Sequence, residues 1–215
     1  MLLSKNSILH AILVFCLGCI GILLIQNLRK RIINTLKSVK YSEIVCIYGS
    51  QAESTEDMKK TLKNAHYLDV LAISGLGIIG LNDSALRRIV LSCGDKTIDI
   101  RLMLLNPESK YVTERASEIG NNVEAYKKGI EMGIAQAKAL KESCPHNIHL
   151  YLYDKKPCWR VIRMDNNYYI SVFDNKFEGR FANVYKIDGK NKGTLGRAFS
   201  RYIDSIIEDS IEIYS

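Results

Sequence analysis

Apolar and polar positions alternate in blocks along the chain, and each block predicts one secondary-structure element. Runs of mainly apolar residues that end in turn-forming residues predict buried strands at Glu43–Tyr48, Leu68–Ser74 and Thr97–Leu105. Between these runs, Ser54 and Asn82 open segments with the capping residues typical of helix starts. The first part of the domain therefore predicts a strand–helix–strand–helix–strand order.

The pattern changes after the third strand. Helical periodicity extends from Glu108 to Ser143, with a break expected at Gly120, and an amphipathic helix closes the domain at Gly193–Asp209. Short strand-like runs separated by turns fill the interval, at Asn147–Tyr153, Cys158–Met164, Tyr168–Phe173 and Asn183–Ile187. We expect an α/β (mixed α+β) fold, in which helices flank one mixed sheet.

The N-terminal segment follows a different pattern, because Ile8–Ile25 is apolar and carries no formal charge. A helix of this length just spans the roughly 30 Å core of a bilayer. A cleaved signal peptide fits less well, because Gln-Asn-Leu-Arg follows the apolar run instead of a small-residue cleavage site. We expect a transmembrane anchor and basic juxtamembrane helix over residues 1–40, and a single folded domain over residues 41–215.

The net charge of +7 is concentrated beside this segment. Residues 1–40 hold six of the 30 Lys and Arg residues and no acid, so 24 basic and 23 acidic residues remain for the domain. Arg29, Lys30 and Arg31 lie just beyond the apolar run, which predicts that the domain is in the cytoplasm and the N-terminus outside the inner (plasma) membrane. These three residues can bind acidic lipid head groups, whereas bulk nucleic-acid binding by the near-neutral domain is not favoured.

Motifs for metal or cofactor binding are weak. The six cysteines are scattered, and Cys144 with His146 and His149 lacks a fourth metal ligand, so we expect neither a metal nor a cofactor. Two turns are candidates for ligand binding. The turns Gly49-Ser50-Gln51 and Ser74-Gly75-Leu76-Gly77 each follow a predicted strand, where α/β sheets bind ligands, although a lone Gly-rich turn is usually only a turn.

Three short stretches occur in a suggestive order: IRLMLLNP from Ile100, CWRVIRMD from Cys158 and FSRYI from Phe199. Together they resemble the phospholipase D-like superfamily, as a degenerate single-domain bacterial member. Active members share an H-x-K-x-x-x-x-D element, whose histidine is the nucleophile and whose lysine holds phosphate. The nearest match is Cys158-x-Arg160-x-x-x-x-Asp165, in which cysteine replaces the histidine.

The resemblance implies that Arg160, with Ser171 nearby, binds phosphate, while Cys158, Arg160 and Asp165 remain candidates for catalysis. A purely structural role for all three, with Cys158 buried, Arg160 in a salt bridge and Asp165 in an Asx turn, is the alternative. The missing histidine argues against an enzyme.

These features predict a membrane-anchored cytoplasmic sensor or effector of a prokaryotic (antiviral) defence or signalling system. It would form a homo-oligomer and bind a nucleotide or phosphate ligand, or a partner protein. This expectation rests on analogy of architecture. The alternatives are a membrane-bound phosphodiesterase, a nuclease or phospholipase acting as a dimer, and an anchored scaffold without a ligand.

Overall fold

The computed structural model describes residues 23–34, 43–92, 96–173, 181–191 and 193–214. The chain divides into two compact units, Met1–Ser42 and Glu43–Ser215. In the first unit, residues 23–34 are helical, and their side chains are exposed. The second unit contains the sheet and all the features discussed below.

The expectation of a membrane-spanning helix requires correction. Nowhere in the described part of the chain does a helix combine the length and the apolar character needed to cross a membrane. Most of the predicted anchor, Ile8–Ile25, lies outside the described residues, and the helix described at 23–34 includes Arg29, Lys30 and Arg31. We therefore withdraw the transmembrane part of the expected fold, together with the single-pass inner-membrane location and its orientation.

The strands of the second unit form one mixed sheet of eight strands in the order β1-β7-β6-β5-β2-β3-β4-β8. Their bounds are β1 Ile44–Tyr48, β2 Tyr67–Leu71, β3 Asp99–Leu105, β4 Asn147–Tyr153, β5 Trp159–Met164, β6 Asn167–Val172, β7 Val184–Asp188 and β8 Ile211–Tyr214. β2, β3 and β4 run parallel, and all the other pairs are antiparallel. The sheet therefore changes from parallel to antiparallel pairing at β2, which lies between β3 and β5.

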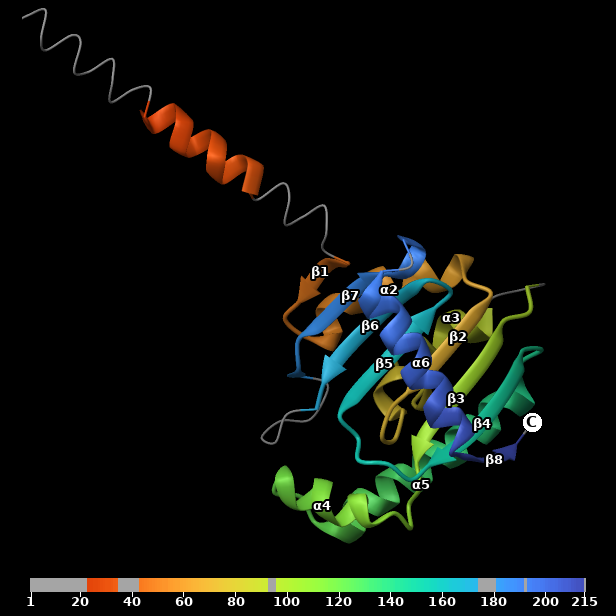
Figure 1. Cartoon of the computed structure of the whole chain (residues 1–215). Helices are drawn as coiled ribbons and strands as arrows, with labels where there is room; N and C mark the ends of the chain where they lie inside the picture. The colour runs from red at the N-terminus through yellow and green to blue at the C-terminus, as the bar shows by residue number, and fades with distance from the viewer. Residues whose placement is uncertain (1–22, 35–42, 93–95, 174–180, 192, 215) are drawn as a thin grey trace, which may run out of the picture. The chain divides into compact units, whose positions relative to one another are not determined.

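Helices cover both faces of this sheet (Figure 1). Their bounds are α2 Gln51–Asn64, α3 Arg87–Ser92, α4 Lys110–Glu118, α5 Val123–Ser143 and α6 Thr194–Glu208, with a π-helical turn η1 at Leu76–Gly80 and a 3-10 turn η3 at Gly189–Asn191. α6 lies on one face, and α2 and α3 lie on the opposite face (Figure 1). The expected break in the long helical region occurs at Gly120, whose positive φ of 66° separates α4 from α5.

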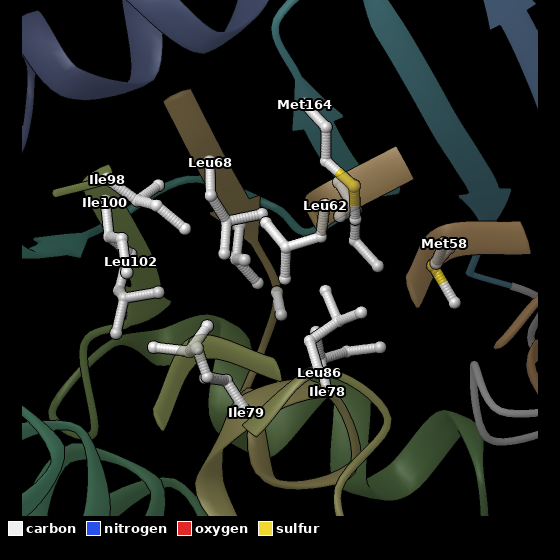
Figure 2. Close-up of a cluster of buried hydrophobic side chains, with 14 of the residues drawn as sticks. Met58, Leu62, Leu68, Ile78, Ile79, Leu86, Ile98, Ile100, Leu102 and Met164 are labelled. Atoms are coloured by element: carbon white, nitrogen blue, oxygen red, sulfur yellow. The ribbon is translucent and has the colours of Figure 1, made fainter. Parts of the chain in front are cut away.

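Strand alternation divides the buried residues between the two faces. In β3, Ile100 and Leu102 pack in one core with Met58 and Leu62 of α2, whereas Met103 packs on the other face. Figure 2 shows the first core, where side chains of α2, β2, β3 and η1 converge on one another. The second core includes Ile203 and Ile206 of α6.

Two elements differ from the pattern expected along the sequence. The helix expected to begin at Asn82 does not begin there. Instead the hydroxyl of nearby Ser84 donates to the Leu76 carbonyl and accepts from the Leu81 amide, each at 2.6 Å. These bonds close the loop that follows η1, so α3 starts only at Arg87. β8 was not expected, because a run of four residues beside Ser210 is too short to show a clear period.

Candidate functional site

A cavity of about 400 Å³ lies where β2 ends, between η1, the α4–α5 region and the side chain of Arg160. Much of its wall is apolar and includes Ile73, Leu76 and Ile130. The polar and charged side chains that line it are Gln51, Ser74, Arg115, Asn121, Tyr126 and Arg160. Among the described lining residues two are cationic and none is acidic, so the cavity favours an anionic ligand.

Arg160 lies near the middle of the sheet, in β5, and only 6% of its surface is exposed. Its Nη1 donates to Gln51 Oε1 at 2.6 Å, and its Nη2 donates to Ser171 Oγ at 2.9 Å. Both acceptors are neutral, and no carboxylate in the described part of the chain forms an ion pair with this guanidinium. Burial lowers the pKa of Arg160 to about 10, so the side chain is still charged at neutral pH.

Gln51 connects Arg160 to the loop after β2. Its amide oxygen accepts from Arg160, and its amide nitrogen donates to the Gly77 carbonyl at 2.8 Å. The position of Gln51 follows from the start of α2, where Ser50 is the N-cap and accepts from the Glu53 amide. The cap therefore directs the first residue of α2 toward the cavity.

The loop from Ser74 to Gly80 forms one wall and has an unusual backbone. Gly75 adopts φ 66°, and its carbonyl accepts from the amides of Ile78, Ile79 and Gly80 at 3.0–3.2 Å. The last of these is an i→i+5 bond, which defines the π-helical turn; such turns occur frequently at functional sites. A side chain at Gly75 would be strained at this φ and would meet Leu104.

Arg115 is the second cation at the cavity. Only 3% of its surface is exposed, and its Nη1 donates to Glu118 Oε2 at 2.9 Å. This hydrogen bond outweighs partial burial and holds the pKa of Glu118 below its ordinary value. The guanidinium carbon of Arg115 lies 5.5 Å from the centroid of the Phe173 ring, and both side chains line the cavity.

The structure brings together some of the residues expected from the sequence and separates others. Arg160 and Ser171 are in direct contact, and Gly75 lines the cavity near them. Gly49 and Ser50 serve the start of α2 instead: the Gly49 amide donates to Glu53 Oε2 at 2.8 Å, and Ser50 is the N-cap. Of the residues expected to bind a ligand, Arg160 and Gly75 therefore line the cavity, Ser171 contacts Arg160, and the Gly49-Ser50 turn does not line it.

The expected group of Cys158, Arg160 and Asp165 is not assembled. Cys158 is exposed just before β5, whereas Asp165 follows the opposite end of the strand, about 20 Å away at the rise of an extended chain. Asp165 Oδ1 accepts from the amides of His66 and Tyr67 at 3.0 Å, with a positive φ of 50° that suits its turn. Arg160 alone of the three lines the cavity.

The sequence analysis did not identify Arg115 and Phe173 as cavity residues, whereas Gln51 belongs to the Gly49-Ser50-Gln51 turn that it named as a candidate. The position of this turn at a strand end was the usable signal. Arg115 and Phe173 gave no local signal, since only the tertiary fold brings α4 beside the end of β6.

His146 and His149, both within the described residues, have structural partners. His146 Nε2 lies 2.6 Å from the Val90 carbonyl, while its Nδ1 accepts from the Ile98 amide, and His149 Nδ1 lies 2.7 Å from Glu212 Oε1. The described residues contain no group of His, Cys, Asp and Glu side chains that could hold a metal ion.

Comparison with solved structures finds similarity to TrmBL2, an archaeal chromatin protein described as showing a novel mode of DNA binding. The TM-score is 0.47 at 16% sequence identity, over 98% of this chain and 72% of that chain. No curated protein matches significantly. At this TM-score the likeness supports no functional argument for the chain.

The expected partners nevertheless need correction. We do not keep the expectation that nucleic acid is a disfavoured partner. The acidic-lipid surface assigned to Arg29, Lys30 and Arg31 depended on the membrane-spanning helix and is withdrawn with it. The expected role as a sensor or effector stays a prediction.

The sequence comparison with protein families is more direct. This comparison neither supports nor excludes the resemblance to the phospholipase D-like superfamily. A family model matches residues 40–197, which is most of the chain and nearly all of the second unit. The chain belongs to the family described as a domain of unknown function, DUF5919.

Proposed function

We propose that the second unit is a ligand-binding domain that holds a phosphate-bearing small molecule in the cavity, with Arg160 as the anion-binding group. The observation that carries the proposal is a buried guanidinium at a cavity wall, held by two neutral acceptors and by no carboxylate among the described residues. Two of its five N–H donors are used by these acceptors, which leaves donors for a ligand oxygen.

Energetics support a functional role for Arg160. Moving a guanidinium out of water costs free energy unless an anion compensates, and the lowered pKa of Arg160 reflects this cost. A bound phosphate would supply the missing charge through charge-assisted hydrogen bonds, for which the planar guanidinium fork is well suited. Cys158 and Asp165 lie at opposite ends of β5, so the arrangement gives no support to hydrolysis.

The test is a thermal unfolding measurement on the full chain in sodium phosphate and in sodium chloride of equal ionic strength. Phosphate at a hundredfold excess over its dissociation constant stabilises a protein by about 2.7 kcal/mol. For a chain of this length, that corresponds to roughly 5–10 °C in Tm. We expect a rise of this size for the wild type and its loss in Arg160→Met.

Arg163→Met is the matched control, because Arg163 lies in the same strand but its Nη1 pairs with Asp69 at 3.5 Å. This variant should keep the phosphate response. Arg160→Lys, which retains charge without the fork, should show a reduced response. An equal rise in wild type and Arg160→Met would indicate general salting-out and contradict the proposal.

A further inference from the structure

From α5, the residues that line the cavity are Ala125, Tyr126, Gly129 and Ile130, and Gly133 lies one helical turn beyond Gly129. At Gly133 a Cβ would overlap the carbonyl oxygen of Ser74, so the helix and the loop are in backbone contact there. At Gly129 a Cβ would meet no atom within 4 Å, and this residue lines the cavity. The helix and the loop therefore touch at Gly133 and separate one turn earlier, which leaves a slot.

The same cavity contains an aromatic–guanidinium pair. Arg115 lies over the ring of Phe173, and both are held by the protein: Arg115 by Glu118, and Phe173 by its amide, which donates to the Cys158 carbonyl at 3.0 Å. Planar guanidinium groups and aromatic rings are the surfaces on which nucleobases stack. An aliphatic tail would gain nothing specific from this pair.

The size of the cavity limits the ligand. Its volume of about 400 Å³ lies near the lower end of the range of about 300–1,000 Å³ that is usual for small-molecule sites. This space suits one nucleotide better than a dinucleotide. Of the two cations that line the cavity, Arg160 has no carboxylate partner among the described residues, and one such cation suits one phosphate group.

We infer that the ligand is a nucleoside monophosphate, with its phosphate at Arg160 and its base in the slot between α5 and the Ser74–Gly77 loop. This inference rests on the proposed function, since it assumes the anion site at Arg160. It adds the base and its stacking partners, and it makes Gly129 the residue that sets the width of the slot.

The experiment is calorimetric titration of the full chain with AMP, GMP, CMP and UMP, alongside ribose 5-phosphate, adenosine, inorganic phosphate, a cyclic dinucleotide and a single-stranded oligonucleotide. At least one monophosphate should bind tenfold or more tightly than ribose 5-phosphate, because base stacking adds this much. Gly129→Leu should remove this advantage while leaving inorganic phosphate binding within about twofold, since its side chain fills the slot away from Arg160. Phe173→Leu should reduce the advantage as well.

The outcomes separate the two proposals. Binding of phosphate and ribose 5-phosphate with no added affinity for any monophosphate would overturn the nucleotide assignment and leave the anion site. Tighter binding of the cyclic dinucleotide or the oligonucleotide than of every monophosphate would also overturn the nucleotide assignment. The same holds if Gly129→Leu weakens the binding of inorganic phosphate as much as that of the monophosphate. Binding of no phosphate compound at all would overturn both proposals.

Discussion

At the scale of single residues, the two faces of the sheet differ in whether a buried charged side chain has a partner of opposite charge. On the α6 face, Asp69 binds Arg101 through two hydrogen bonds of 2.7 and 2.8 Å and also pairs with Arg163. On the opposite face, Arg160 has only neutral acceptors. Because stability alone would favour a compensated charge, the uncompensated one is the better marker of a ligand site.

A second buried polar group, the hydroxyl of Tyr153, leads to a separate prediction. The hydroxyl of Tyr153 has no hydrogen-bond partner among the described residues, the ring is 2% exposed, and burial raises the pKa of this phenol well above its ordinary value. Tyr153→Phe removes the unsatisfied hydroxyl, and we expect the free energy of unfolding in urea to increase by about 1 kcal/mol.

Tyr169→Phe is the matched control for this substitution. Its hydroxyl donates to Asp57 Oδ2 and contacts Thr61 Oγ1, each at 2.8 Å, so the same change should lower the free energy of unfolding by about 1 kcal/mol. A loss of stability in Tyr153→Phe would mean that its hydroxyl has a partner after all.

At the scale of elements, α5 offers two glycines one turn apart with opposite expected effects. Gly129→Ala should raise the free energy of unfolding by about 0.5–1 kcal/mol, because alanine is the better helix former and its methyl group meets open space. Gly133→Ala should destabilise by more than about 2 kcal/mol, because its methyl group overlaps the Ser74 backbone and must displace the loop or the helix. Chemical denaturation of both variants tests the pair, and equal effects would contradict the close contact at Gly133.

The elements differ in how far their sequences predict them. β3 and β4 are apolar over most of their length, and Asn122 caps α5, so both strands and the α4–α5 break follow from local patterns. The η1 turn does not, because its π geometry depends on Gly75 and on Ser84 eight residues beyond Leu76. Arg160 could be identified from the sequence as a phosphate candidate, but its partner Gln51 lies 109 residues away, and only the sheet order brings the two together.

At the scale of the whole molecule, Asp57 joins α2 to three strands of the sheet. Its Oδ2 accepts from Tyr48 of β1, Tyr169 of β6 and Lys186 of β7, at 2.7–2.8 Å. Burial alone would raise the pKa of Asp57, but these bonds outweigh it and the net pKa is lowered. Burial and the neighbouring carboxylate raise the pKa of both tyrosines.

These shifts give a pH dependence of stability with two limbs. The lowered pKa of Asp57 contributes stability above the unfolded value of about 3.9, and this contribution is lost as the pH falls through the folded pKa. The raised pKa values of Tyr48 and Tyr169 contribute stability that is complete below about pH 10 and is lost as the pH rises above it. Denaturation between pH 3 and 11 should show both limbs.

Single substitutions test which residue causes each limb of the pH dependence. Tyr169→Phe should flatten the alkaline limb, and Asp57→Asn the acid limb, whereas Tyr67→Phe, at an exposed tyrosine, should change neither. An alkaline limb as steep in Tyr169→Phe as in the wild type would exclude Tyr169 as its source.

The order of strands also determines when the sheet can form during synthesis. β1 is an edge strand that pairs with β7, where Ile44 lies opposite Ile187. β1 therefore leaves the ribosome long before its partner strand β7 has been synthesised. Until then the backbone groups of β1 are unpaired, and the strand includes the apolar residues Val45 and Ile47. Nascent chains that stop short of β7 should consequently be substrates for chaperones, and release of the complete chain should be followed by slow, nonlocal closure of the sheet.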